Sequence, residues 1–386
     1  MDHQANTQEL VGSADLLKKS IGEDLLPLAL AVQDVDVTFG KVERRFFGNP
    51  RSPLDCEADD IIAFVDAYLP QIAPDAIVLR RDVDPNAVTK LLEFHEVVDH
   101  YAPIIANLAL ASIPAQKGHH KSCSETEIAR FKKALYILHL TTILFTRDDQ
   151  LNPATAARAD DIEPAWIHFW SKFAPWELQQ TRCAHDLLAR HTQNVSNANP
   201  MQRRGKPYKK TFSQGVLRAF VINEGLVDLR HLEGLASKHH LRVAIDKFEE
   251  FSPNWARLEP WYKKHDKMYL EQTDDSTQLD VSSILAKHPE AESGPSDSWM
   301  HTLLQMHVDD AIFQAGSDSL FHCGQHAIEW GYAFWDRERL DAASRGLLPT
   351  TAEMQDVSDI TVFTEDVDYN ADFRLHSGCT CKKGRY

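Results

Sequence analysis

Residues Ser124–Phe145, SETEIARFKKALYILHLTTILF, decide the fold class that the sequence predicts. Ser124 and Glu127 form the pattern S-x-x-E of a capping box, in which two side chains satisfy two backbone N–H groups at a helix start. Apolar residues then recur three and four apart, which is the spacing of one helix face; they are Ile128, Phe131, Leu135 and Leu138. The stretch therefore predicts a helix whose narrow apolar seam faces other helices.

Similar helical signals recur on both sides of this stretch. Asp84–Pro85 is a favourable helix start, because proline at the first helical position loses no needed hydrogen bond. Pro103 is expected to kink or break the helix that follows. The other expected helices are Asp59–Leu69, Ala165–Phe173, Pro175–Gln193, Phe212–Phe251, Trp299–Gly316 and Leu320–Ala343. Strand signals are sparse, with Asp359–Phe363 the most tempting, so the sequence predicts an all-α fold: an irregular multi-helix bundle with long polar loops.

Composition divides the chain into five expected segments. The stretch 271–298 is rich in Asp, Ser, Glu and Pro and is predicted to be a mobile acidic linker. The segments are an N-terminal helix and loop (1–58), a helical core (59–270), the acidic linker (271–298), closing helices packed on the core (299–348) and an acidic, largely irregular tail (349–386).

Charge and cysteine content restrict the classes of function. The chain has 386 residues and a formal net charge of −16. A nucleic-acid footprint needs a basic face, and anionic lipid attracts basic segments, so neither nucleic acid nor membrane is an expected partner. The six cysteines are scattered and no apolar leader opens the sequence. These features predict a cytoplasmic or nuclear protein with reduced thiols.

The stretch Leu320–Arg345, LFHCGQHAIEWGYAFWDRERLDAASR, contains the best metal candidates in the sequence. His322 and His326 are four residues apart, so on a helix they could chelate one ion. Such a site needs further ligands, such as Glu329 or Asp336. The alternative is packing, because Cys323 lies on an apolar stripe between the two histidines.

A second histidine pair and one Cys/His pair have less favourable spacing. His95 and His100 are five apart, which separates them by about 140° on a helix. His95 also lies on an apolar stripe, so it is predicted to be a structural histidine with a satisfied hydrogen bond. Cys183 and His185 are two apart and do not face each other, although a site assembled from distant segments stays open. No catalytic residue and no cofactor is predicted.

One basic run stands out in this acidic chain. Residues 203–210 read RRGKPYKK. The run is interpreted as a solvated loop within Asn194–Lys210, with a nuclear-localisation or partner-docking patch as the alternatives. The sequence holds no glycine-rich phosphate loop, nucleophile elbow or dinucleotide fingerprint.

Three stretches together resemble one known group of proteins. They are SETEIARFKKALYILHLTTILF (124–145), PWELQQ with CAHDLL (175–180 and 183–188) and WGYAFWDRERL (330–340). In this order they are similar to motifs of the uncharacterised filamentous-fungal proteins described as F-box or F-box-like. The likeness covers most of residues 60–345, and its motifs are packing motifs.

The resemblance implies an intracellular helical scaffold for protein–protein interaction. An F-box docks on the Skp1 adaptor of a ubiquitin ligase, so the resemblance also implies a substrate-adaptor role. Leu25–Ala29, LLPLA, lacks the acidic residue that usually follows Leu-Pro, so the F-box is degenerate or absent. The alternative function is a metal-dependent or Cys/His enzyme with a site assembled between helices.

Overall fold

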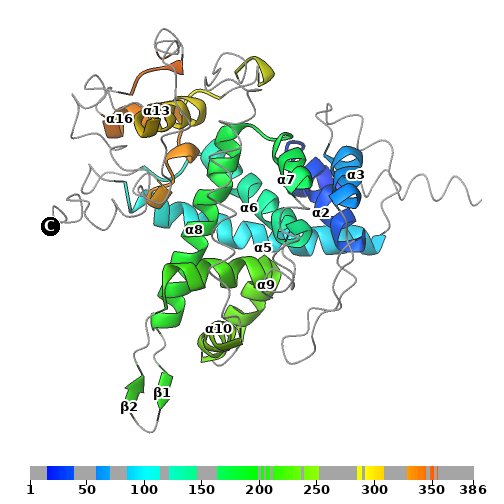
Figure 1. The fold of residues 1–386 in the computed structure, drawn as a ribbon, viewed down its shortest axis with the longest axis vertical. Coiled ribbons are helices and arrows are strands. Elements are labelled where there is room, and N and C mark those ends of the chain that lie inside the picture. The colour runs from blue at the N-terminus through cyan, green and yellow to red at the C-terminus, as the bar shows by residue number, and fades with distance from the viewer. Residues whose placement is uncertain are drawn as a thin grey trace, which may run out of the picture. The chain divides into compact units, whose positions relative to one another are not determined.

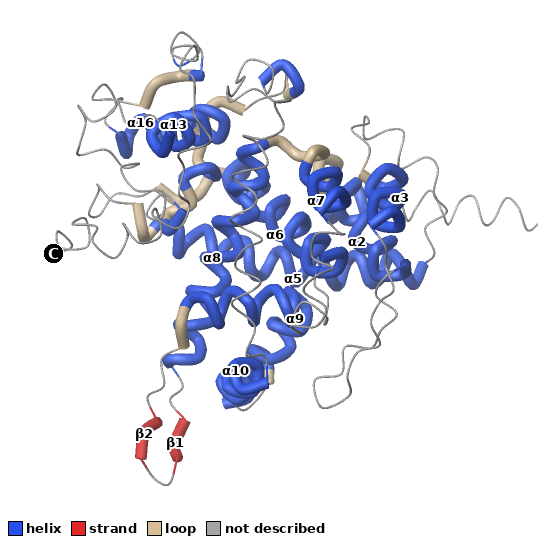
Figure 2. Tube along the Cα trace, in the orientation of Figure 1, coloured by secondary structure: helices blue, strands red, loops and turns tan. Residues whose placement is uncertain are grey.

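A computed structural model describes the parts of the chain in which helices gather (Figures 1 and 2). The described residues are 15–38, 58–69, 85–113, 121–145, 163–198, 201–203, 206–208, 212–235, 239–251, 285–288, 292–307, 328–344, 348–351 and 354. They confirm the predicted all-α class, with one short hairpin besides the helices. The chain forms two compact units: unit 1 is Met1–Leu108 with Cys123–Glu259, and unit 2 is Ala109–Ser122 with Pro260–Tyr386.

Unit 1 is built around helix α6 (Glu125–Phe145). The capping box predicted at its start is present, because Ser124 N donates to Glu127 Oε2 at 2.9 Å and Glu127 N donates to Ser124 Oγ at 3.1 Å. Every residue from Ala134 to Phe145 is buried. The buried surface of α6 is therefore wider than the narrow apolar face that the sequence predicts. The reason is that α6 contacts helices on several sides, and a helix covered all round is apolar all round.

The partners of α6 include helices from both ends of unit 1. The helices of this unit besides α6 are α2 (Leu26–Thr38), α3 (Ala58–Tyr68), α5 (Pro85–Leu110), α7 (Glu163–Trp170), α8 (Pro175–Ala198), α9 (Gln214–Gly234) and α10 (His239–Phe251). Among the contacts, α2 and α8 pack on α6, α3 packs on α7, and α9 packs on α8 and α10. α5 begins at Pro85 as predicted. Of the two outcomes expected at Pro103, a kink or a break, the break does not occur, because the helix continues to Leu110.

Helix α2 is the most apolar part of the N-terminal segment. Its leucines do not reach the surface: Leu26 is 1% exposed, and the neighbouring Leu25, Leu28 and Leu30 are also buried. Since α2 packs on α6 and α3, these side chains belong to the core of unit 1.

The region predicted as a polar loop, Asn194–Lys210, has more structure than expected. Helix α8 continues to Ala198, and a hairpin of β1 (Met201–Arg203) and β2 (Lys206–Tyr208) follows. The strands are antiparallel, with Met201 opposite Tyr208, Gln202 opposite Pro207 and Arg203 opposite Lys206. In Figures 1 and 2 the hairpin lies beyond the end of α8, clear of the other helices of its unit in that view.

Unit 2 contains α13 (Pro295–His307), the 3₁₀ turn η4 (Tyr332–Phe334) and α16 (Arg337–Ser344). The continuous helix predicted for 320–343 is wrong in its described part. Gly331 adopts φ 65°, a left-handed conformation that favours glycine, and Trp335 is extended. The aromatics therefore follow a turn, and the spacing of four between Trp330 and Phe334 imitates a helix face.

The start of α13 corrects a second expectation, because Pro295–Ser298 lies within the predicted mobile linker. These residues are helical and buried. Their polar side chains bond to local backbone: Ser296 Oγ donates to Glu292 O at 2.8 Å and Ser298 Oγ to Pro295 O at 3.1 Å. Serine and aspartate thus serve a helix start here, in a composition that also suggests disorder. Across the described ranges, no helix combines the length and hydropathy needed to cross a membrane.

Candidate functional site

The predicted metal candidates His322 and His326 lie outside the described residues, so the metal site stays a prediction. Within the described ranges, no group of three or more His, Cys, Asp and Glu side chains is placed to hold a metal ion. Other titratable residues singled out by the sequence are described, namely His95, His100, Cys183, His185 and Arg337, and they belong to four separate clusters.

The first cluster surrounds His95 on α5. Its imidazole is buried, with Nδ1 2.9 Å from the Tyr136 hydroxyl on α6 and Nε2 3.5 Å from Asp99 Oδ2. Lys132 Nζ lies 2.6 Å from the other oxygen of Asp99. Burial lowers the pKa of His95, while the charge of Asp99 acts in the opposite direction. The hydrogen bond expected for a structural histidine is thus present, and it joins α5 to α6.

The second cluster joins α8 to α9 through the CAHDLL segment. His185 is buried, and its Nε2 donates to the backbone carbonyl of Arg218 at 2.7 Å. Asp186 accepts a hydrogen bond from Arg218 Nη2 at 2.9 Å. Burial lowers the pKa of His185 to about 4, and burial raises the pKa of the Cys183 thiol above its ordinary range. A neutral imidazole and a protonated, fully buried thiol are groups of the helix interface, not an activated pair.

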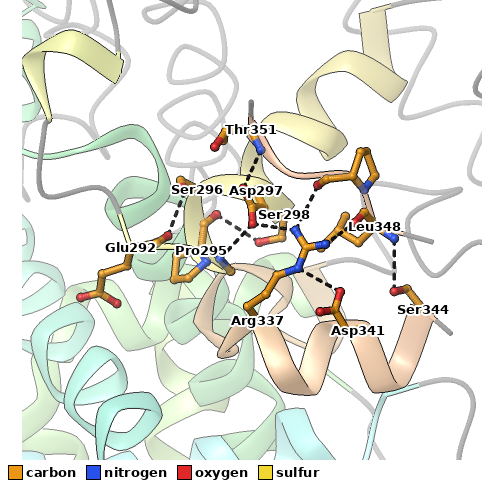
Figure 3. A network of polar contacts seen from close by, with 12 residues as sticks. Glu292, Pro295, Ser296, Asp297, Ser298, Arg337, Asp341, Ser344, Leu348 and Thr351 are labelled. Carbon is orange, nitrogen blue, oxygen red and sulfur yellow. Dashed lines mark hydrogen bonds and ion pairs between the residues drawn. The ribbon is translucent and has the colours of Figure 1, made fainter. Parts of the chain in front are cut away.

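The third cluster forms in unit 2 around Arg337, the arginine of the WDRERL segment (Figure 3). Arg337 Nη1 donates to Asp297 Oδ2 at 2.7 Å, and Nε donates to Asp341 Oδ1 at 2.9 Å. The same guanidinium also donates to the backbone carbonyls of Leu348 and Pro349. Burial acts against the charged form, but Asp297 and Asp341 outweigh it and raise the pKa of Arg337.

Asp297 completes this third cluster from the first turn of α13. Its side chain is 3% exposed and accepts from Gly294 N at 3.3 Å and from Thr351 N at 2.7 Å. Gly294 has φ +102°, and a Cβ there would come within 2.6 Å of the Trp335 carbonyl oxygen. The buried carboxylate therefore binds three segments of unit 2, a role that no sequence motif assigned to it. Its signal was the pattern G-P-S-D, in which proline marks the first helical position and Asp follows in the first turn.

A neighbouring contact extends the third cluster. Arg339 donates to the carbonyls of Lys121 at 3.1 Å and Ser122 at 3.0 Å, and its guanidinium lies 5.3 Å from the centre of the Trp335 ring. Trp335 Nε1 in turn donates to the carbonyl of Trp330 at 2.9 Å. Both arginines of the WDRERL segment therefore bind backbone carbonyls, and Arg337 also binds a buried carboxylate.

The fourth cluster is the candidate functional site. It combines Tyr101 and His100 of α5, His191 of α8, and Glu233 with Arg230 of α9. His191 Nε2 lies 3.2 and 3.3 Å from the two oxygens of Glu233. The Tyr101 ring packs edge-on against His191, with centroids 6.0 Å apart, and against His100, with centroids 5.0 Å apart. Three helices thus bring five polar side chains to one place.

The surroundings shift the pKa values of two members of this fourth cluster in opposite directions. Tyr101 is fully buried, and burial followed by the charge of Glu233 raises the pKa of its phenol above the ordinary range. Burial, and then the positive charge of Arg230, lowers the pKa of His100. Among the described residues, the Tyr101 hydroxyl has no hydrogen-bond partner of good geometry. A buried polar atom without a well-formed hydrogen bond is unusual in a folded protein, so this hydroxyl makes the cluster a candidate functional site.

The chemistry available to the fourth cluster is proton positioning. A histidine paired with a carboxylate can accept or donate a proton, and a nearby neutral phenol can donate a hydrogen bond. His191 and His100 are half-buried, so solvent reaches the edge of the cluster. Sequence reasoning missed the site because His191 and Glu233 lie 42 residues apart on two helices and Tyr101 joins them from a third, with no shared motif.

Comparison of the chain with protein-family models, with curated proteins and with solved structures finds no match.

Proposed function

We propose that this protein is a helical scaffold for protein–protein interaction, as the resemblance to the F-box-like group implies. The observation that carries the proposal concerns the three stretches of that resemblance. Each contributes a polar side chain that joins it to another segment: Tyr136 to His95, Asp186 to Arg218, and Arg337 to Asp297. The distinctive residues of the chain therefore stabilise the packing of segments within each of the two units.

Such packing suits a scaffold because partner binding costs less when the surface is already ordered. The charge of the chain supports the same reading. A net charge of −16 keeps such a protein apart from nucleic acid and other acidic partners, and it favours partners that carry a basic patch.

The ubiquitin-ligase form of this proposal needs a docking surface other than the Leu-Pro segment. Leu25, Leu26 and Leu28 are packed in the core of unit 1, so Skp1 could reach these side chains only if α2 left the core. Replacing Leu26 with Asp would place a charge in an apolar core and unfold the unit. Loss of Skp1 binding in that variant would therefore reveal nothing about docking.

Proximity labelling of the full chain in its native host, read by mass spectrometry, tests the scaffold proposal. We expect a reproducible set of partner proteins that the labelling enzyme alone does not recover. The matched control is a chain with Leu135→Asp, which unfolds unit 1 at a fully buried position and should lose that set. Recovery of Skp1 would support the adaptor form. A folded chain that labels no protein beyond the background would overturn the proposal.

An enzyme is the second candidate, and the Tyr101–His191–Glu233 arrangement favours it. Chromogenic esters and phosphate esters provide the test. Hydrolysis that Glu233→Gln abolishes and that an exposed substitution, Glu96→Gln, leaves unchanged would support an enzyme. Activity that Glu233→Gln does not alter would place any chemistry elsewhere.

A further inference from the structure

The β1–β2 hairpin contains two cations of the basic run, Arg203 on β1 and Lys206 on β2. Five of the eight residues from 203 to 210 are Arg or Lys, in a chain of net charge −16. In the strand register Arg203 lies directly opposite Lys206, on the hairpin face that also carries positions Met201 and Tyr208. Like charges in directly opposite positions destabilise a hairpin. An anionic partner would relieve this repulsion.

The register also distinguishes the two outer edges of the hairpin. Two residues link the strands, so Arg203 and Lys206 form the hydrogen-bonded pair beside the turn. Hydrogen-bonded and open pairs alternate along an antiparallel ladder, so the backbone groups of Gln202 and Pro207 point outward. Pro207 has no N–H, which blocks the β2 edge, as prolines on edge strands do. Gln202 keeps both N–H and C=O, so the β1 edge can pair with another strand.

We propose that the hairpin docks an extended acidic segment of a partner protein. The segment adds to the β1 edge at Gln202, and its carboxylates neutralise the cations around the Arg203–Lys206 pair. This is the strand-addition mode of peptide recognition, in which backbone bonds orient a segment and side chains select it. The inference rests on the proposed scaffold function and names the chemistry of one partner.

An acidic peptide suits the hairpin better than nucleic acid does. Nucleic acid carries a continuous line of phosphates that would lie close to an acidic protein, and that long-range repulsion opposes binding. A short acidic segment needs to contact only the hairpin. The attraction is between exposed charges, so it is weakened by salt.

Fluorescence anisotropy of a short fluorescein-labelled peptide of alternating Glu and Val tests the inference on the full chain. We expect saturable, salt-sensitive binding that a Lys-Val peptide does not show. The double variant Arg203→Glu, Lys206→Glu should weaken binding at least about tenfold, because two attractive charges become repulsive. Its matched control, Lys19→Glu with Lys90→Glu, reverses two exposed cations on helices of the same unit and should bind like the native chain.

Gln202→Pro tests the edge separately, since it removes the outward N–H without altering charge. We expect weaker binding of the Glu-Val peptide, and unchanged binding would overturn the strand-addition mode. Equal binding by the charge-reversed chain, or tighter binding of duplex DNA than of the peptide, would overturn the acidic-segment assignment. Proximity labelling of the charge-reversed chain separates the two proposals: if the peptide never binds but the partner set persists, the hairpin inference fails and the scaffold stands.

Discussion

The Arg337–Asp297 cluster of unit 2 and the Tyr101–His191–Glu233 cluster of unit 1 are both polar groups packed among helices, yet they differ in completeness. Arg337 and Asp297 bond to a carboxylate, two backbone carbonyls and two backbone N–H groups in addition to each other. Tyr101 buries a hydroxyl near the Glu233 carboxylate, with no hydrogen bond of good geometry to any described residue. A completed network holds a fold together, whereas an incomplete one at the edge of solvent leaves capacity for binding or chemistry.

The largest effect is expected from Asp297→Ala, which removes the central carboxylate of the completed cluster in unit 2. The substitution leaves the Arg337 guanidinium, which is 23% exposed, beside two N–H groups that have lost their acceptor. We expect the free energy of unfolding of unit 2 to fall by about 3 kcal/mol, as when a buried ion pair loses one partner. Urea unfolding followed by tryptophan fluorescence measures this, since Trp299, Trp330 and Trp335 lie in the unit.

The matched control for Asp297→Ala is Glu338→Gln. Glu338 pairs with Lys121 at 3.4 Å, but both side chains are more than 80% exposed. Exposed pairs of this kind contribute little, so no measurable change is expected. Equal losses in the two variants would show that the buried network does not hold unit 2 together.

A second completed cluster, around His185, gives a prediction that depends on pH. Burial lowers the pKa of His185 to about 4 in the folded chain, from the ordinary value of 6.5. Between these values the unfolded chain binds a proton that the folded chain excludes, so the free energy of unfolding falls as the pH drops from 6.5 towards 4 and this contribution then levels off. The full contribution is at most about 3 kcal/mol.

Urea unfolding across this pH range, compared between the native chain and His185→Gln, isolates that contribution. Glutamine does not titrate and retains an N–H for the Arg218 carbonyl. We expect the variant to lose less stability than the native chain as the pH falls. Parallel curves would show that His185 is protonated in the folded state.

These contacts indicate which features sequence reasoning can reach. The capping box at Ser124 and the helix start at Pro85 were predictable because their physical causes lie within four residues. The aromatic run before Arg337 was assigned to a helix because a turn at Gly331 can place large side chains inward at the same spacing. Asp297 was assigned to a mobile linker because acidic, serine-rich composition is common both in disorder and at helix starts.

The candidate site could not be predicted from local sequence patterns, for a different reason. His191 and Glu233 meet only because α8 and α9 pack side by side, and Tyr101 joins them from α5. No spacing along the chain encodes that packing. The sequence did identify His95 correctly as a hydrogen-bonded structural histidine, since its place on the apolar stripe of α5 implied a buried partner.

The last and smallest expected effect comes from two buried tyrosines that differ mainly in hydrogen bonding. They compare a completed polar cluster with an incomplete one most directly. Both Tyr101 and Tyr136 are fully buried in unit 1. The Tyr136 hydroxyl lies 2.9 Å from His95 Nδ1, whereas the Tyr101 hydroxyl has no hydrogen bond of good geometry to any described residue. Tyr136→Phe should reduce the free energy of unfolding by about 1–2 kcal/mol, because it removes a buried hydrogen bond and leaves a ring nitrogen unsatisfied. Tyr101→Phe removes a hydroxyl whose interaction with Glu233 lacks good hydrogen-bond geometry, so the folded state should be unchanged or slightly more stable. Urea unfolding of the two variants under the same conditions measures the difference.

A loss in Tyr101→Phe as large as in Tyr136→Phe would mean that the Tyr101 hydroxyl forms a stabilising hydrogen bond. The fourth cluster would then be one more completed network.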